Sequence, residues 1–240
     1  MRVILSGGGT AGHIYPALAI ANALEDLLDN RADCHSLDLL YIGTSDGQES
    51  SLVKRYGLPI KTVSSGPIRG RSPLSLIQNS LKMIKGYIEA RSIVKEFKPD
   101  AILSTGGYAS FPISLAAYTH GIKLLVYLPD IEPGWAVRAI SKMANHIAVS
   151  TESASKNFPP NKTIVTGYPV RKSFENITRS KARQALNMSL DEKIVLDSFD
   201  LYIIESNLLS NKPIKFSAVS PFFIIAFLYT FLNCLSFIFP

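Results

Sequence analysis

Short apolar runs alternate with longer segments of helical periodicity over the first 150 residues of the chain. Apolar runs of strand length occupy residues 3–6, 37–42, 60–63, 101–103, 123–127 and 146–150. Apolar residues at helical spacing fill the intervals, at residues 14–28, 52–56, 75–97, 112–119 and 135–143. Strands that alternate with helices of this length are typical of a parallel sheet covered on both faces. We therefore predict an α/β fold, a Rossmann-like doubly wound parallel sheet with functional groups at the carboxyl ends of its strands.

The pattern changes after residue 158. Turn-forming residues at 159–161 precede a short strand at 163–166, which predicts the edge of the first domain and the start of a linker. A short helix at 180–186 and a strand at 193–196 follow, and we interpret them as the beginning of a second domain.

The last part of the chain has a different composition. Residues 216–239 are rich in Phe, Ile and Leu and contain neither a charged residue nor a glycine. About 20 apolar residues suffice to span a bilayer, and a shifted reading frame would equally produce such an unpatterned segment. We divide the chain into a domain at 1–165, a linker with the start of a second domain at 166–196, and a divergent apolar tail at 197–240.

Composition narrows the class of protein. Hydrophobic residues make up 47% of the chain and charged residues 18%, which favours a packed core over disorder. The net charge of +6 suits an anionic membrane surface or a phosphate-bearing ligand, and equally suits simple solubility. Cys34 and Cys234 lie far apart and near no cluster of His or Cys, so we expect neither a disulfide framework nor a zinc site. The apolar run after Met1 is too short for a secretory signal.

A glycine-rich loop follows the first strand. Gly7, Gly9 and Gly12 fit the spacing G-x-G-x-x-G, in which backbone N–H groups at a helix start face an anion. The loop is compatible with a dinucleotide site, another phosphate site or a plain tight turn. A nucleotide-dependent Rossmann oxidoreductase is the minor alternative, because the second strand does not end on an acidic residue and Asp46 comes late.

His13 stands directly after this loop, at the start of the helix. The positive helix end should lower the pKa of the imidazole and leave it neutral, ready to accept a proton. The alternative is a surface histidine that caps the helix or packs on Tyr15.

The strand at 101–103 ends in a second glycine turn at Gly106 and Gly107. Two such turns at the carboxyl ends of strands in one sheet predict a shared anionic ligand such as a pyrophosphate, unless both are ordinary tight turns. After the next strand, Asp130 and Glu132 are candidates for a base or for contacts with sugar hydroxyls. Either residue could instead cap the helix that begins near Trp135.

Three segments together resemble one family. Residues 4–19, 106–110 and 166–171 are similar, in the same order and at comparable spacing, to the MurG family, the bacterial lipid-linked N-acetylglucosaminyltransferases of peptidoglycan synthesis. The resemblance covers residues 1–196 and implies the N-terminal domain of a GT-B glycosyltransferase with an incomplete second domain. It implies transfer from UDP-N-acetylglucosamine to undecaprenyl-pyrophosphoryl-muramyl-pentapeptide (lipid I to lipid II), without metal or cofactor and with no nucleic-acid partner.

The resemblance also implies roles for individual residues. His13 corresponds to the catalytic-site histidine, and Arg171 to an arginine near the donor. The other residues implied in substrate binding are Thr10, Ala11, Gly12, Gly106, Gly107, Tyr108 and Asp130. In the family two glycines usually precede the histidine, whereas this chain has Ala11 and Gly12. Asp130 replaces an asparagine expected to touch the donor, and a carboxylate there would repel a diphosphate.

Beyond Leu196 the family continues with a third glycine loop in its donor domain, which this sequence does not show. We therefore expect the chain to be truncated and inactive alone. The alternatives are an acceptor-binding subunit whose donor domain is supplied by a separate chain, a lipid-binding module without activity, and a non-functional remnant.

Membrane contact is predicted around the helix at 75–97. The residues that combine basic charge with apolar surface are Arg69, Arg71, Leu76, Ile77, Lys82 and Lys85. Each well-placed basic residue contributes about 1 kcal/mol at an anionic lipid surface. The alternative is a helix packed on the core with a solvated basic face. The expected location is peripheral, on the cytoplasmic face of the cell membrane, with a tail that could also be inserted.

Overall fold

A computed structural model describes residues 1–29, 36–44, 49–67, 73–170, 177–191, 193–196 and 201–204. The chain divides into two compact units, Met1–Lys172 and Ser173–Pro240. We describe each unit by itself.

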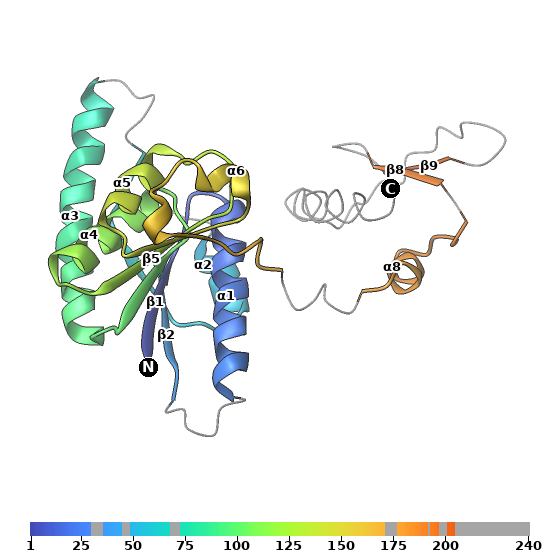
Figure 1. Cartoon of the computed structure of the whole chain (residues 1–240), viewed down its shortest axis with the longest axis horizontal. Coiled ribbons are helices and arrows are strands. Elements are labelled where there is room, and N and C mark those ends of the chain that lie inside the picture. Colours follow the sequence, from blue (N-terminus) through green and yellow to red (C-terminus); the bar gives the residue numbers. More distant parts are fainter. Residues whose placement is uncertain are drawn as a thin grey trace. The chain divides into compact units, whose positions relative to one another are not determined.

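The first unit is built on a seven-stranded parallel sheet with the order β3-β2-β1-β4-β5-β6-β7 (Figure 1). Its strands are β1 (Arg2–Ser6), β2 (Asp38–Thr44), β3 (Ile60–Val63), β4 (Ala101–Ser104), β5 (Lys123–Leu128), β6 (His146–Val149) and β7 (Thr163–Val165). The chain moves outward from β1 to β3 and then returns to place β4 on the other side of β1. The loops that follow β1 and β4 therefore lie next to each other, at the switch point where ligands bind in open α/β sheets.

Helices cover both faces of the sheet. They are α1 (Ala11–Asp29), α2 (Glu49–Arg55), α3 (Pro73–Phe97), α4 (Phe111–Thr119), α5 (Trp135–Met143) and α6 (Glu152–Ser155), with short 3₁₀ turns η1 (Tyr108–Ser110) and η2 (Pro160–Lys162). Figure 1 shows α1 and α2 on one side of the sheet and α3, α4 and α5 on the other. This division follows from right-handed crossovers, which switch face when the strand order reverses.

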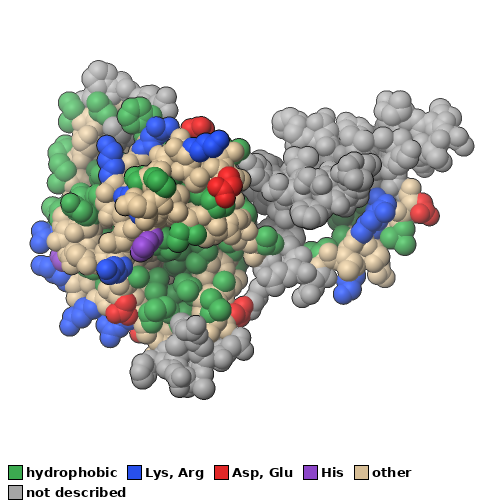
Figure 2. All heavy atoms as spheres, in the orientation of Figure 1, with side chains coloured by type: hydrophobic (Ala, Val, Ile, Leu, Met, Phe, Trp, Pro, Cys, Tyr) green, Lys and Arg blue, Asp and Glu red, His purple; other side chains and the backbone are tan. Residues whose placement is uncertain are grey.

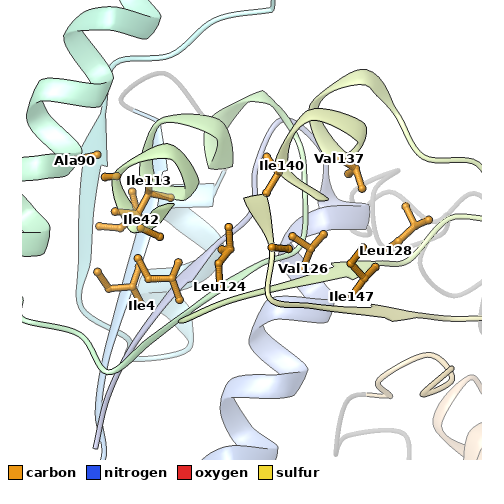
Figure 3. Close-up of a cluster of buried hydrophobic side chains, with 14 of the residues drawn as sticks. Ile4, Ile42, Ala90, Ile113, Leu124, Val126, Leu128, Val137, Ile140 and Ile147 are labelled. Atoms are coloured by element: carbon orange, nitrogen blue, oxygen red, sulfur yellow. The ribbon is translucent and has the colours of Figure 1, made fainter. Parts of the chain in front are cut away.

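The strands bury side chains toward both helix layers. On β1, Ile4 packs in the cluster beneath α3, α4 and α5, whereas Leu5 packs beneath α1, and neither is exposed. Figure 3 shows Ile4, Ile42 and Leu124 from three strands gathered below Ile113 of α4. Full burial of such a side chain contributes about 1.5–3 kcal/mol. The near-continuous apolar runs of the strands reflect this burial on two faces.

The predicted α/β class and parallel doubly wound sheet are confirmed. The helix at 135–143 and the strand at 60–63 have the predicted bounds, whereas several other boundaries differ. β2 continues past the predicted end at residue 42, because Gly43 and Thr44 pair with Thr62 and Val63 of β3 although neither adds to the apolar run.

The second unit contains one helix and one strand pair within its described residues. Helix α8 (Arg179–Ala185) begins after Thr178, whose side chain accepts a hydrogen bond from the Lys181 N–H. Strands β8 (Lys193–Leu196) and β9 (Leu201–Ile204) pair antiparallel. The strand at 193–196 was predicted and β9 was not.

Within the described ranges, no helix has the length and apolar character needed to cross a membrane. The apolar segment 216–239 lies outside those ranges.

Candidate functional site

The two glycine loops pack against each other, backbone to backbone, at the carboxyl ends of β1 and β4. A β-carbon on Gly107 would lie 2.0 Å from the carbonyl oxygen of Gly8. A β-carbon on Gly7 would lie 2.0 Å from Oγ1 of Thr105. Gly107 also has a φ of +80°, which L side chains rarely adopt. Glycine is therefore required here by close approach as well as by backbone conformation.

Further contacts hold the two loops in register. A β-carbon on Gly9 would lie 2.9 Å from Cε1 of Tyr108, so the tyrosine ring lies over the first loop. From β2, the buried Tyr41 hydroxyl donates to the Gly7 carbonyl at 2.5 Å. Ser65 Oγ donates to the Tyr108 carbonyl at 2.7 Å. The predicted residues Gly106, Gly107 and Tyr108 are thus brought together with the first loop.

His13 is fixed by a reciprocal pair of hydrogen bonds with Thr105. The imidazole Nδ1 lies 2.8 Å from the Thr105 carbonyl oxygen, and Thr105 Oγ1 donates to the His13 carbonyl at 2.5 Å. Because a carbonyl oxygen only accepts, a neutral His13 must carry its proton on Nδ1. Its Nε2 then bears a lone pair that can accept a proton.

Burial lowers the pKa of His13 below its ordinary value of 6.5, while the negative charge of Asp130 and the bond to Thr105 raise it. The predicted direction is confirmed, and the largest cause is the loss of solvent around the ring. His13 is therefore neutral near pH 7. The ring binds the Thr105 carbonyl in the loop after β4 and is half-buried, so His13 is not a free surface side chain.

The start of α1 offers backbone donors for an anion. Thr10 and Gly12 are exposed and Ala11 is half-buried. Neither α1 nor the η1–α4 segment carries an acidic residue in its first turn. Unpaired N–H groups and the positive end of the helix dipole favour a negatively charged ligand at such a place.

Asp130 and Glu132 lie in the loop between β5 and α5. The suggested helix-capping role is wrong for both, because Gly134 occupies the N-cap position of α5. Glu132 instead lies 3.6 Å from Arg138, whose Nε donates to the Pro133 carbonyl at 3.0 Å. Asp130 is exposed, and its charge acts on His13.

The segment at 166–170 also reaches this edge of the sheet. The Tyr127 hydroxyl at the end of β5 donates to the Gly167 carbonyl at 3.1 Å. Burial raises the pKa of Tyr127, with smaller contributions from Tyr168 and Asp130, so its hydroxyl stays protonated. Arg171, predicted to lie near the donor, is outside the described residues.

Glu49 is a buried residue of the site region that sequence reasoning missed. Its Oε1 accepts from the Thr44 backbone N–H at 2.9 Å and from Thr44 Oγ1 at 2.7 Å. A β-carbon on Gly8 would lie 2.7 Å from the same oxygen, so Glu49 supports the first glycine loop from below. Nothing local in the sequence distinguishes it from an exposed acidic residue at a helix start.

Helix α3 presents an apolar stripe to solvent. Ile77, Leu81, Ile84 and Ile88 are 58–63% exposed, and their spacings of four, three and four residues place them on one side of the helix. The predicted Leu76 is 40% exposed.

Basic residues accompany the stripe. Lys82 and Lys85 are also exposed, and Figure 2 shows hydrophobic side chains along the α3 edge of this unit with Lys and Arg side chains nearby. The alternative of a core-packed apolar face is wrong for these residues. Arg69 and Arg71 lie outside the described residues.

Comparison with known proteins agrees with this arrangement. Residues 3–149 match the model of the glycosyltransferase family 28 N-terminal domain. The chain is 38% identical over 197 residues to an enzyme of Alkaliphilus oremlandii named UDP-N-acetylglucosamine–N-acetylmuramyl-(pentapeptide) pyrophosphoryl-undecaprenol N-acetylglucosamine transferase, covering 82% of this chain and 52% of that protein. A protein of the same name from Desulforudis audaxviator is 41% identical, with 83% and 52% covered.

A solved structure gives the same picture. The crystal structure of Acinetobacter baumannii MurG is 25% identical and superposes with a TM-score of 0.59, covering 76% of this chain and 48% of that one. This chain thus spans about half the length of the relatives that it matches. The family match gives the oxidoreductase alternative no support. The chain belongs to glycosyltransferase family 28, and its residues 3–149 form the N-terminal domain of that family.

Proposed function

We propose that this chain supplies the acceptor-binding half of a transferase that moves N-acetylglucosamine from UDP-N-acetylglucosamine to a lipid-linked muramyl-pentapeptide. The names of the relatives at 38% and 41% identity support this substrate pair. The part of this chain that matches the family, residues 3–149, contains the two glycine loops and His13.

The observation that carries the proposal is the joining of both glycine loops to His13 through Thr105. One loop supplies the start of α1 and the other supplies Gly107, so both can offer backbone N–H groups to one pyrophosphate. The imidazole of His13 is held between them with Nε2 as its free acceptor.

The proposed chemistry uses these groups in a simple way. The loops hold the pyrophosphate of the acceptor so that a sugar hydroxyl lies near His13. This hydroxyl oxygen forms a bond to the anomeric carbon of the donor sugar, the bond from that carbon to UDP breaks, and His13 Nε2 takes the hydroxyl proton. Backbone amides near the departing diphosphate would stabilise its charge.

The exposed stripe of α3 would bring the site to the acceptor. Ile77, Leu81, Ile84 and Ile88 provide apolar surface for the lipid boundary, while Lys82 and Lys85 provide positive charge toward anionic headgroups. We propose peripheral attachment of the first unit through this stripe.

A transfer assay tests the proposed function. The full chain is mixed with the half of the Alkaliphilus oremlandii relative that it does not span, radiolabelled UDP-N-acetylglucosamine and the lipid-linked acceptor. Substitution His13→Ala should lower transfer by about 10²–10⁴-fold, the usual contribution of a general base. His146→Ala, at an exposed histidine on β6, should leave transfer unchanged. Equal transfer by the His13→Ala variant would remove His13 from the reaction.

A further inference from the structure

A carboxylate stands at the end of β5, beside the loop that holds His13. Strands β4 and β5 pair in register, with Ser104 opposite Val126, so their carboxyl ends lie side by side. Thr105 directly follows β4, and Asp130 comes two residues after β5 ends at Leu128. The topology therefore brings Asp130 to the same edge as the Thr105–His13 pair.

The chain after Asp130 continues into α5, which packs against Gly106 next to the His13 ring. A β-carbon on Gly106 would lie 2.7 Å from Cγ2 of Val137 on α5 and 3.3 Å from both Cε1 and Nδ1 of His13. Gly106 is thus enclosed between α5 and the histidine ring. The loop that carries Asp130 connects β5 to this helix, so its path runs past the His13 site.

We propose that Asp130 is the charge partner of His13, a positioning residue whose carboxylate stabilises the imidazolium formed when His13 accepts the proton of the acceptor hydroxyl. This inference rests on the proposed function for its role in the reaction. The proton moves from the hydroxyl oxygen to Nε2 and later to water. Thr105 already fixes the tautomer, so Asp130 acts through its charge and not by orienting the ring.

The effect on His13 is consistent with this assignment. The charge of Asp130 raises the pKa of His13 against the stronger lowering by burial. A buried base of depressed pKa gains basicity from a nearby anion, which brings it closer to the working pH. The amide expected at this position from the family resemblance would provide no such charge.

Two other ionisable groups near Asp130 have partners of their own. Glu132 in the same loop is paired with Arg138 of α5 at 3.6 Å, so the charges of these two largely offset each other. The Tyr127 hydroxyl of β5 is bonded to Gly167 and has a raised pKa, so it carries no charge. Asp130 is the charged side chain that acts on His13 within the described part of the chain.

Titration of His13 by NMR tests the pairing without any transfer activity. The ¹⁵N-labelled full chain contains four histidines, and a His13→Gln variant identifies the signals of His13. Asp130→Asn should lower the measured pKa of His13 by about half a unit, a size suited to an exposed and partly screened charge. Glu132→Gln, the same isosteric change in the same loop, should shift it by less than about 0.2 unit, and about 0.5 M salt should shrink the Asp130 effect.

Two outcomes would overturn the inference: an unchanged pKa of His13 in Asp130→Asn, or equal shifts in both variants. The transfer assay adds a separate reading, in which Asp130→Asn should move the acidic limb of the kcat/KM profile to lower pH. If Asp130→Asn lowers the pKa of His13 but no transfer is seen, the pairing is supported and the proposed function is not. If transfer depends on His13 but Asp130→Asn leaves the pKa of His13 unchanged, the function is supported and the pairing is rejected.

Discussion

Gly107 and Gly8 meet so closely that a β-carbon on Gly107 would lie 2.0 Å from the Gly8 carbonyl oxygen. The contact joins residues from the ends of β1 and β4, which are neighbours in the sheet but almost a hundred positions apart in sequence. It explains why the second loop needs glycine, and it makes the relative position of the two loops a rigid feature of the fold.

Substitution Gly107→Ala should therefore be strongly destabilising. Gly57 also has a positive φ, +76° against +80° for Gly107, but nothing lies within 4 Å of a β-carbon there. Gly57→Ala should cost about 1 kcal/mol for the backbone conformation alone. Gly107→Ala should cost about 1–3 kcal/mol more because the loops must separate. Urea denaturation followed by the fluorescence of Trp135 measures both, and equal losses would contradict the packing.

Glu49 should be a major determinant of stability. Glu49→Ala removes both hydrogen bonds to Thr44 and leaves a buried backbone N–H unpaired, which should cost about 1–3 kcal/mol. Glu49→Gln retains an acceptor oxygen and should cost less. The exposed Glu25 provides the control, since Glu25→Ala should stay within about 0.5 kcal/mol of the unmodified chain. A small effect of Glu49→Ala would mean that Thr44 finds other partners.

The half-buried His13 should make folding stability depend on pH. Its pKa is lower in the folded state than the unfolded value of 6.5, so the unfolded chain binds more protons below that pH. The contribution of His13 to the free energy of unfolding is therefore fully present above pH 6.5. It is lost as the pH falls toward the folded-state pKa, by at most about 1.4 kcal/mol per pH unit.

A His13→Gln variant should lose less stability than the unmodified chain between pH 7 and pH 5. Urea midpoints measured across this range compare the two slopes. Identical slopes would show that His13 is as accessible to protons in the folded protein as in the unfolded one.

The stripe on α3 should dominate binding to lipid. Leu81 on the stripe and Leu27 on α1 are both 61% exposed, so they form a matched pair. Leu81→Gln should weaken binding to anionic phosphatidylglycerol vesicles about tenfold, since burial of one leucine contributes about 1.5–3 kcal/mol. Leu27→Gln should leave binding unchanged. Equal binding by both variants in a flotation assay would place the lipid contact elsewhere.

The sequence indicated the architecture well because periodicity is a local property. The alternation of runs predicted a parallel α/β sheet, and the helix at 135–143 was predicted to the residue. Local patterns also located both glycine loops. They did not reveal how far β2 extends, since Gly43 and Thr44 owe their strand conformation to pairing with β3.

Long-range partners were beyond the reach of such patterns. The bond from His13 to Thr105 joins residues 92 positions apart, and burial of the ring there lowers its pKa. Glu49 is likewise packed against Gly8, which lies 41 positions earlier in the sequence. The apolar residues of the α3 stripe have the same spacing as those of a buried helix face. Only the structure shows that this face is exposed to solvent.

Binding of the acceptor's pyrophosphate tests the central claim most directly. The chain has a single tryptophan, Trp135, at the start of α5 in the site region, and its fluorescence can report a titration with ligand in bicelles. Two ligands are compared, a lipid-linked muramyl-pentapeptide with a pyrophosphate bridge and the same molecule with a monophosphate bridge. We predict saturable binding of the first and at least about tenfold weaker binding of the second, a difference of about 1.4 kcal/mol. Equal affinity for both ligands, or no binding of either, would contradict the assignment of the paired glycine loops to the acceptor's pyrophosphate.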